Sequence, residues 1–293
     1  MKKIVILTAT YNHPQKLREL YESLLQQEDK EFSWVIVDDG SGPETEEVCR
    51  EIQKEKLLDV LVMKQENSGK GKATNTGIDA LTPEAEFFAV IDDDEVLAPN
   101  AVEIIRKYTE AYGASDCAAI NFCRRNEKGE ITPIPYIDKD YFMSVQEHIS
   151  QKRMTGGYIG YFVKKLGDAR FSVYENEKYI APSTLMMKAT AKNQRLLWCR
   201  EIIGTTEFLE GGITKQGRRL KVKSPNGMVE YCGLMQGSGS SFFNRLKYSA
   251  MGYAYASIGG KNVRGNEYLK AFSKIAYLPG IALGAYWKRK FVK

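Results

Sequence analysis

The stretch that decides the fold is Ala89-Val90-Ile91-Asp92-Asp93-Asp94-Glu95, in which an apolar run beginning at Phe87 ends in four acidic residues. A short apolar run predicts a buried strand, so the acidic cluster lies at the carboxyl end of that strand. Ligands of open parallel sheets bind in the crevice at those ends. Adjacent carboxylates repel one another, and a hard divalent cation such as Mg²⁺ or Mn²⁺ offsets that repulsion. The alternative is a solvated turn that caps a helix starting near Pro99.

The residues around this stretch alternate between strand and helix patterns. Apolar and β-branched runs predict strands over 3–8, 32–37, 57–63, 87–91 and 117–123. Apolar residues at helical spacing predict helices over 14–26, 44–56, 73–81 and 100–112. Strands that alternate with helices of this length imply a parallel sheet with right-handed crossovers, and hence an α/β fold.

The composition is that of an ordinary globular protein of 293 residues, with 43% hydrophobic and 27% charged residues. The start of the chain predicts no signal peptide, and no apolar run reaches the roughly 18 residues that a membrane span needs. The five cysteines form no C-x-x-C motif, so we expect reduced thiols in the cytoplasm. Only two histidines are present, which leaves carboxylates as the metal ligands to consider.

Charge is divided unevenly along the chain, whose net charge is +5. Residues 215–293 contain 15 Lys or Arg and 2 acidic residues, a net charge of +13, which leaves −8 for residues 1–214. Such a split indicates two parts with different tasks.

Three loops gather at the carboxyl edge of the predicted sheet: 8–12, 38–41 and 92–95. Asp38-Asp39-Gly40-Ser41 is either a turn with a helix cap or a source of carboxylates that accept hydrogen bonds from a nucleotide. The glycine-rich residues 67–72 suit an anion at a helix start, with Lys70 and Lys72 as counter-charges. This loop is neither a G-x-G-x-x-G motif nor a Walker P-loop.

Taken together, four segments resemble a family 2 glycosyltransferase of the GT-A fold, of the type that builds bacterial surface polysaccharides. They are Thr8-Ala9-Thr10-Tyr11-Asn12, Val37-Asp38-Asp39-Gly40-Ser41, Asn67 to Gly77, and Ile91-Asp92-Asp93-Asp94. The resemblance covers roughly residues 1–125. It implies a nucleotide-sugar donor, usually a uridine diphosphate (UDP) sugar, and Mn²⁺ or Mg²⁺ held by a D-x-D-type motif.

The resemblance also implies roles for individual residues. Tyr11 and Asp39 lie against the base, Asp93 lies near the ribose, and Asp94 binds the metal together with Asp92. The full donor-binding set is Thr8, Ala9, Thr10, Tyr11, Asp39, Lys70, Lys72, Asp92 and Asp93. A cation bridging both phosphates stabilises the charge that builds on the leaving group, while an acceptor hydroxyl attacks from the opposite face and inverts the anomeric centre.

A carboxylate that takes the acceptor's proton is harder to find. Related enzymes carry an acidic residue soon after a segment like 171–180, but Pro182 stands where a catalytic Glu is expected. Glu177 is the favoured candidate, and Glu175 and Glu210 are the others. The alternative is that these are exposed loop acids. Residues 154–161, rich in Gly and Tyr, are expected to form an acceptor surface unless they are packed core.

The basic, aromatic region 215–293 ends in a stretch without charge, 275–287, followed by Lys288-Arg289-Lys290. Such a tail suits the interface of a membrane. The alternative is a soluble helical tail packed on the domain. We see no nucleic-acid-binding module and expect no nucleic-acid partner.

These observations predict three regions: a donor-binding half at 1–125 and an acceptor half at 126–214 of a catalytic domain, then a C-terminal extension at 215–293. The predicted function is inverting transfer of a sugar to a hydroxyl of a glycan or polyprenyl-linked acceptor, by an enzyme peripheral to the inner face of the cell membrane. The alternatives are a nucleotidyltransferase and a protein that binds a nucleotide or glycan without turnover.

Overall fold

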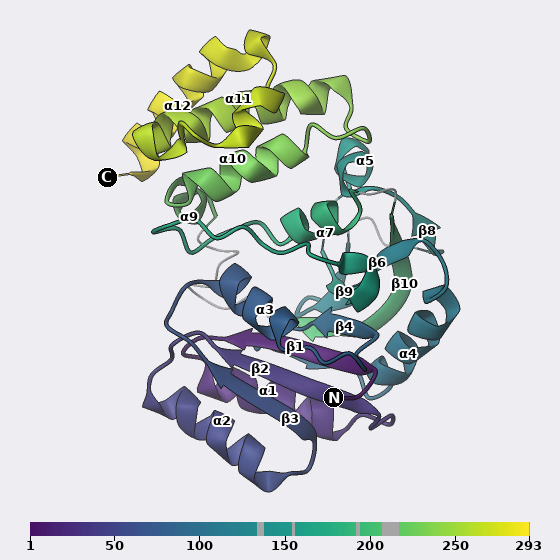
Figure 1. The fold of residues 1–293 in the computed structure, drawn as a ribbon. Coiled ribbons are helices and arrows are strands. Elements are labelled where there is room, and N and C mark those ends of the chain that lie inside the picture. The colour runs from purple at the N-terminus through teal and green to yellow at the C-terminus, as the bar shows by residue number, and fades with distance from the viewer. Residues whose placement is uncertain (134–137, 154–155, 192–193, 207–216, 293) are drawn as a thin grey trace.

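One mixed β-sheet runs through the protein in the computed structural model, which describes residues 1–133, 138–153, 156–191, 194–206 and 217–292 (Figure 1). Its described strands are β1 Ile4–Thr10, β2 Phe32–Asp38, β3 Asp59–Lys64, β4 Phe87–Val90, β5 Glu95–Leu97, β6 Cys117–Asn126, β7 Ile131–Thr132, β8 Tyr141–Phe142, β9 Tyr158–Phe162 and β10 Arg195–Thr206. The α/β class is confirmed.

The strand order is β3-β2-β1-β4-β9-β6-β10-β5, with β7 beside β6 and β8 beside β10. The strands of the β3-β2-β1-β4 half pair in parallel, as the alternation of strands and helices predicts. The sheet as a whole is mixed, because β9, which was not predicted as a strand, lies antiparallel between β4 and β6, and β5 lies antiparallel to β10. The carboxyl ends of β1, β2 and β4 still share one edge.

Strand β9 also corrects the expectation for residues 154–161, of which 154 and 155 lie outside the described residues. Tyr158 and Tyr161 are each only 1% exposed, so this segment is not an acceptor surface. Gly160 faces Phe87 so closely that a Cβ there would lie 2.2 Å from the ring. Aromatic side chains fill both faces of a central strand here, which is the packed-core alternative.

Helices cover both faces of the sheet. On one face lie α1 Pro14–Leu25, α2 Pro43–Glu55 and α4 Ala101–Tyr112, packed on residues such as Ile4 and Ile6. On the other lie α3 Lys70–Asp79 and α7 Ser183–Ala189, on the side of Val5 and Leu7 (Figure 1). This alternation along β1 follows from the two-residue period of a strand.

The predicted helices are present, with small shifts at their ends. Helix α3 begins at Lys70, three residues earlier than the predicted 73, because Gly69 takes a positive φ of 92° and turns the chain into the helix. Strand β3 begins at Asp59 because Lys56, in the left-handed region, ends α2 just before it. Helix α3 also approaches β1 closely: a Cβ on Gly77 would lie 2.1 Å from a methyl carbon of Leu7.

Most of the remaining described helices form a layer above α3 and α7 (Figure 1). They are α5 Val145–Ser150, α9 Arg218–Val222, α10 Pro225–Leu234, α11 Phe242–Gly259 and α12 Tyr277–Phe291, with 3₁₀ turns over Gly260–Val263, Glu267–Ala271 and Lys274–Ala276. The short helix α6 Val163–Leu166 instead packs on β6 and β9. Arg218 anchors α12, because its guanidinium lies over the Trp287 ring at 4.1 Å and donates to the Tyr255 hydroxyl at 2.5 Å.

The predicted helical tail is therefore present as α12. The boundary predicted at residue 214 lies outside the described residues and stays a prediction. Among the helices that the structure describes, none is both long and apolar enough to cross a membrane.

Candidate active site

The three predicted loops meet at the carboxyl edge of the sheet. Thr10, the last residue of β1, donates its hydroxyl to Asp93 Oδ2 at 2.6 Å. The backbone N–H of Asp39 donates to the Thr10 carbonyl at 2.9 Å, and the N–H of Asn12 donates to the Ser41 hydroxyl at 2.9 Å. The ends of β1, β2 and β4 are thus joined by direct hydrogen bonds.

Asp39 is buried and holds the glycine-rich loop. Its Oδ1 accepts from the Gln65 amide at 2.7 Å and from the backbone N–H of Ser68 at 2.9 Å, and its Oδ2 accepts from the N–H of Gly69 at 2.8 Å. The Asp39 side chain therefore holds the loop that precedes α3 in place, independently of any contact that Asp39 makes with a bound ligand.

The other residues expected around the donor differ in exposure. The Thr8 side chain is fully buried and accepts from the Trp34 indole at 3.0 Å, and Ala9 beside it is partly buried. Tyr11, directly after β1, is 46% exposed. Lys70 is the first residue of α3 and Lys72 the third, with the Lys72 Nζ 3.5 Å from the Ser68 hydroxyl. The predicted anion-binding loop is thus found at the start of a helix.

Charges in the acidic cluster are only partly compensated. Asp92 forms an ion pair with Lys70, and Glu95 forms one with Arg124. Burial, together with the negative charges of Asp92 and Asp93, raises the pKa of Asp94 to about 6. Burial also raises the pKa of Glu95, and the charge of Arg124 opposes that rise. An added cation would relieve this excess of negative charge.

Asp93 has a second partner that the sequence did not single out. The His13 Nδ1 lies 3.2 Å from both carboxylate oxygens of Asp93. That hydrogen bond raises the pKa of His13 above 6.5. His13 and Arg124 are site residues that sequence reasoning missed. His13 stands between the loop 8–12 and the start of α1, and that position was the available signal.

The chemistry of the donor set fits a hard cation. Within the described residues, no three His, Cys, Asp or Glu side chains are grouped so as to hold a metal by themselves. Asp92 and Asp94 supply carboxylate oxygens, and Mg²⁺ or Mn²⁺ commonly completes its coordination with water and substrate phosphates. The site therefore suits a cation shared with a bound ligand.

Residues 171–180, which we call the crossing segment, pass over the start of α3. A Cβ on Gly69 would lie 2.1 Å from the Lys178 carbonyl oxygen, and one on Gly71 would lie 2.6 Å from Ile180 Cγ2. A small cavity lies between the two segments and is lined by Ser68, Gly71, Lys72, Ser172, Val173, Tyr174, Glu177, Lys178, Tyr179 and Ile180. The predicted donor loop is thus covered by the region in which we sought the proton acceptor.

The three candidate proton acceptors stand in different positions. Glu177 accepts from the backbone N–H and side-chain amide of Asn226 at 2.8 and 3.0 Å, and from the N–H of Gly227 at 2.9 Å, so it caps α10. Burial raises its pKa. Glu175 is exposed, and Glu210 lies outside the described residues. Pro182 stands directly before α7.

Comparison with known families gives one match over more than half of the chain. Residues 5–169 match the model of glycosyl transferase family 2. The matched residues include β1, β2, β4 and the acidic cluster that the structure places at one edge.

Relatives with curated descriptions are similar over parts of the chain. The glycosyltransferase GlyA of Streptococcus pneumoniae is 28% identical over 50% of this chain and 21% of its own length. The minor teichoic acid biosynthesis protein GgaA of Bacillus subtilis is 27% identical over 34% of this chain and 23% of its own length. The chain thus spans less than a quarter of the length of either relative.

Solved structures resemble the whole chain in fold. Staphylococcus aureus TarS 1-349 in complex with UDP-GlcNAc has a TM-score of 0.65 at 17% identity, covering 99% of this chain and 81% of that one. The mannosyltransferase PcManGT of Pyrobaculum calidifontis, in complex with GDP-Man and Mn²⁺, has a TM-score of 0.59 at 14% identity, covering 100% and 88%. At these identities the likeness establishes the fold alone.

Proposed function

The chain belongs to glycosyltransferase family 2, and from that premise we propose that it transfers a sugar, with inversion, from a UDP-sugar to a hydroxyl of a glycan or polyprenyl-linked acceptor in cell-surface polysaccharide synthesis. The observation that carries the proposal is the convergence of Asp39, Asp93 and the glycine-rich loop at the carboxyl edge of the sheet. The UDP-GlcNAc bound by TarS supports the donor class, and the teichoic acid name of GgaA supports the acceptor class.

We assign the donor contacts to residues at this edge. Tyr11, exposed beside β1, stacks on the base, and Asp39 lies at the base as well as holding the loop. Asp93, oriented by Thr10 and His13, accepts from the ribose hydroxyls. Lys70 and Lys72 supply positive charge at the start of α3, where backbone N–H groups also favour an anion.

Asp94 and Asp92 would hold Mn²⁺ or Mg²⁺ here. The Mn²⁺ in the PcManGT structure is compatible with this assignment. When bound, the cation supplies Lewis-acid stabilisation of the leaving diphosphate. Lys70, which pairs with Asp92, lies beside the same position and adds positive charge toward the diphosphate.

The side-chain carboxylate of Glu177, Glu175 or Glu210 accepts the proton of the acceptor hydroxyl. Glu177 is favoured by its position in the cavity beside Lys72 and by its raised pKa. Its hydrogen bonds to α10 compete with that role. Glu175 is exposed and close in sequence, which keeps it as the second candidate.

We also propose that the protein works at the inner surface of the cell membrane. Leu278, Ile281, Ala282 and Ala285 are exposed and spaced so that they share one face of α12. Lys288, Arg289 and Lys290 follow and are exposed too. An apolar stripe beside a basic cluster suits an anionic lipid surface.

A panel of nucleotide sugars, incubated with the protein and with glycan or lipid-linked acceptors, tests the activity. Release of a nucleoside diphosphate with glycosylated acceptor is the expected result. Release of pyrophosphate would identify a nucleotidyltransferase instead. Binding without turnover across the panel would identify a protein that only binds a nucleotide or glycan.

A further inference from the structure

An ion pair between a partly buried lysine and a fully buried glutamate lies behind the crossing segment. Glu230 of α10 is 0% exposed, and its carboxylate lies 2.5 Å from Lys188 Nζ of α7. Taking two charges out of water is costly unless hydrogen bonds complete their shells. Those additional bonds all come from residues 170–174, so this pair joins two helices and a loop.

Four hydrogen bonds connect the pair to that loop. The Ser172 hydroxyl lies 3.1 Å from Glu230 Oε1, and the Tyr174 hydroxyl donates to Glu230 Oε2 at 2.9 Å. Lys188 Nζ donates to the Ser172 hydroxyl at 2.8 Å and to the Arg170 carbonyl at 3.1 Å. Because hydrogen bonds are directional, these four bonds hold the loop in one position against the ion pair and do not merely keep it buried.

The other side of the crossing segment is bonded to α3. The Asn75 side chain donates to the Phe171 carbonyl at 2.8 Å and accepts from the Phe171 N–H at 2.9 Å. The Lys178 ammonium also reaches the Asn67 side chain, beside the close approach of Lys178 to Gly69. A shift of the crossing segment would therefore move residues 67–71.

We propose that Lys188 and Glu230 are positioning residues for the donor loop. The pair fixes the crossing segment, and the crossing segment holds residues 67–71 in the conformation in which Ser68 and Gly69 bond to Asp39. The identity of the ligand, a nucleoside diphosphate sugar, rests on the proposed function; the mechanical link between the pair and the loop does not. The C-terminal helices thereby act on donor binding from outside the donor site.

Hydrogen exchange and UDP titration of three variants test this link. Lys188→Met breaks the pair, and Tyr174→Phe removes one bond without leaving a buried charge unpaired. In the ligand-free protein, both should speed exchange of the amides at 67–73 and 171–180. Both should also weaken UDP binding, Lys188→Met by roughly tenfold, the scale of a typical coupling between sites.

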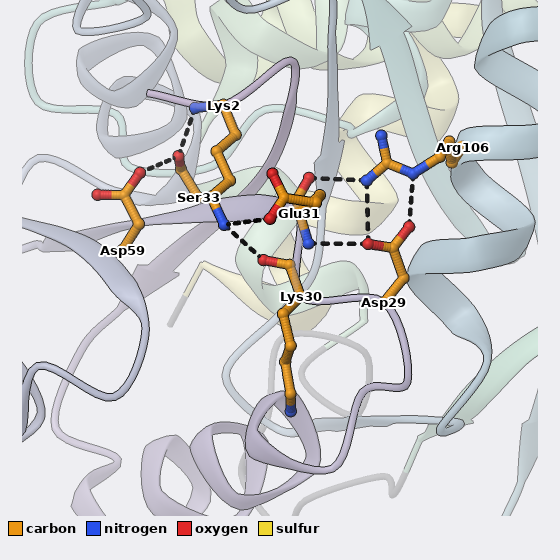
Figure 2. A network of polar contacts seen from close by, with 7 residues as sticks. All are labelled: Lys2, Asp29, Lys30, Glu31, Ser33, Asp59 and Arg106. Carbon is orange, nitrogen blue, oxygen red and sulfur yellow. Dashed lines mark hydrogen bonds and ion pairs between the residues drawn. The ribbon is translucent and has the colours of Figure 1, made fainter.

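A control variant separates this effect from general loss of stability. Asp29→Asn disrupts the pair of Asp29 with Arg106, which belongs to the polar network with Lys2 and Ser33 that Figure 2 shows. Asp29 precedes the amino end of β2, whereas the donor loop lies at the carboxyl end. This variant should lower thermal stability and leave exchange at 67–73 and UDP affinity unchanged. Unchanged exchange at 67–73 in both Lys188→Met and Tyr174→Phe would overturn the proposal. Faster local exchange in a protein that does not bind UDP would uphold the link and refute the donor assignment alone.

Discussion

The carboxylate of Asp39, the first residue after β2, accepts a hydrogen bond of 2.8 Å from the backbone N–H of Gly69, thirty residues further along the chain. Gly69 has a positive φ and precedes α3, so this bond joins two of the segments that the sequence singled out. One buried carboxylate therefore orders the loop that is proposed to receive the diphosphate.

Asp39→Asn should weaken UDP binding by roughly tenfold or more, because the amide presents a donor where a loop N–H or a base N–H needs an acceptor. It should also lower the free energy of unfolding by about 1–3 kcal/mol, the cost of a buried group left unsatisfied. Calorimetric titration and thermal unfolding measure the two effects. Asp116→Asn, in a half-exposed pair with Arg195, serves as the control and should change neither appreciably. Wild-type affinity in Asp39→Asn would reduce Asp39 to a turn residue.

His13 should titrate above pH 6.5, because its hydrogen bond with Asp93 favours the charged imidazole. Its contribution to stability is fully present below 6.5, the unfolded value, and is lost as pH rises through the folded pKa. NMR can follow this directly, since the chain contains only two histidines. Asp93→Asn should return the pKa of His13 towards 6.5. A His13 pKa that does not respond to that variant would mean that Asp93 does not orient it.

The donor half of the fold was predictable because its signals are local. Each strand up to β4 is a short apolar run followed by a turn, and the same edge collects Thr10, Asp39 and Asp93 once the strands are parallel. The position of the acidic cluster could therefore be predicted from the sequence once the strands were taken to be parallel.

The other half depended on contacts distant in sequence. Strand β9 is an aromatic run without alternation, and only its neighbours β4 and β6 decide that both of its faces are buried. Glu177 is similar: nothing near it in sequence indicates that its partners are the first residues of α10, fifty positions later. The roles of Lys188 and Glu230 arise from the same kind of distant packing.

Removal of metal should abolish most of the affinity for UDP. We expect a loss of roughly tenfold or more on treatment with EDTA, or in Asp94→Asn, with recovery of the wild type on addition of Mn²⁺ or Mg²⁺. The pKa of Asp94 is raised to about 6. The affinity for UDP should therefore fall as the pH drops through that value, because the Asp94 carboxylate becomes protonated and binds the metal less well. Calorimetric titration across pH measures both effects. Affinity that ignores EDTA and the variant would refute the metal assignment.

The proton acceptor can be found by replacing each candidate with Gln. The variant that removes the base should lower kcat by roughly 100-fold or more while leaving UDP affinity intact. We expect this of Glu177→Gln, with Glu175→Gln and Glu210→Gln as parallel variants. Glu177→Gln should also lower thermal stability, because the amide nitrogen cannot accept from α10. A loss of stability with full kcat would show that Glu177 is only a helix cap.

Membrane association should depend on the outward face of α12 and not on its buried face. Trp287 packs on Tyr255 and Arg218, so truncation of the tail would damage the helical layer as well. Leu278 is 76% exposed and can be changed without opening a cavity. Leu278→Asp should therefore reduce sedimentation with anionic vesicles, since it places a negative charge among the apolar residues that meet the lipid. Leu57→Asp, at a residue 63% exposed between α2 and β3, is the matched control and should bind as the wild type does.

The basic residues that follow the apolar face of α12 should contribute to vesicle binding independently of that face. Replacing Lys288, Arg289 and Lys290 with Gln removes three charges, each of which adds about 1 kcal/mol near an anionic surface. Binding of the wild type should be stronger to anionic than to neutral vesicles and should weaken as salt screens these charges. The Gln variant should lose both the preference for anionic lipid and the salt dependence, while UDP affinity stays unchanged because the donor site lies at the sheet edge. If Leu278→Asp, Leu57→Asp and the wild type sediment equally, or none sediments, the face of α12 does not bind lipid.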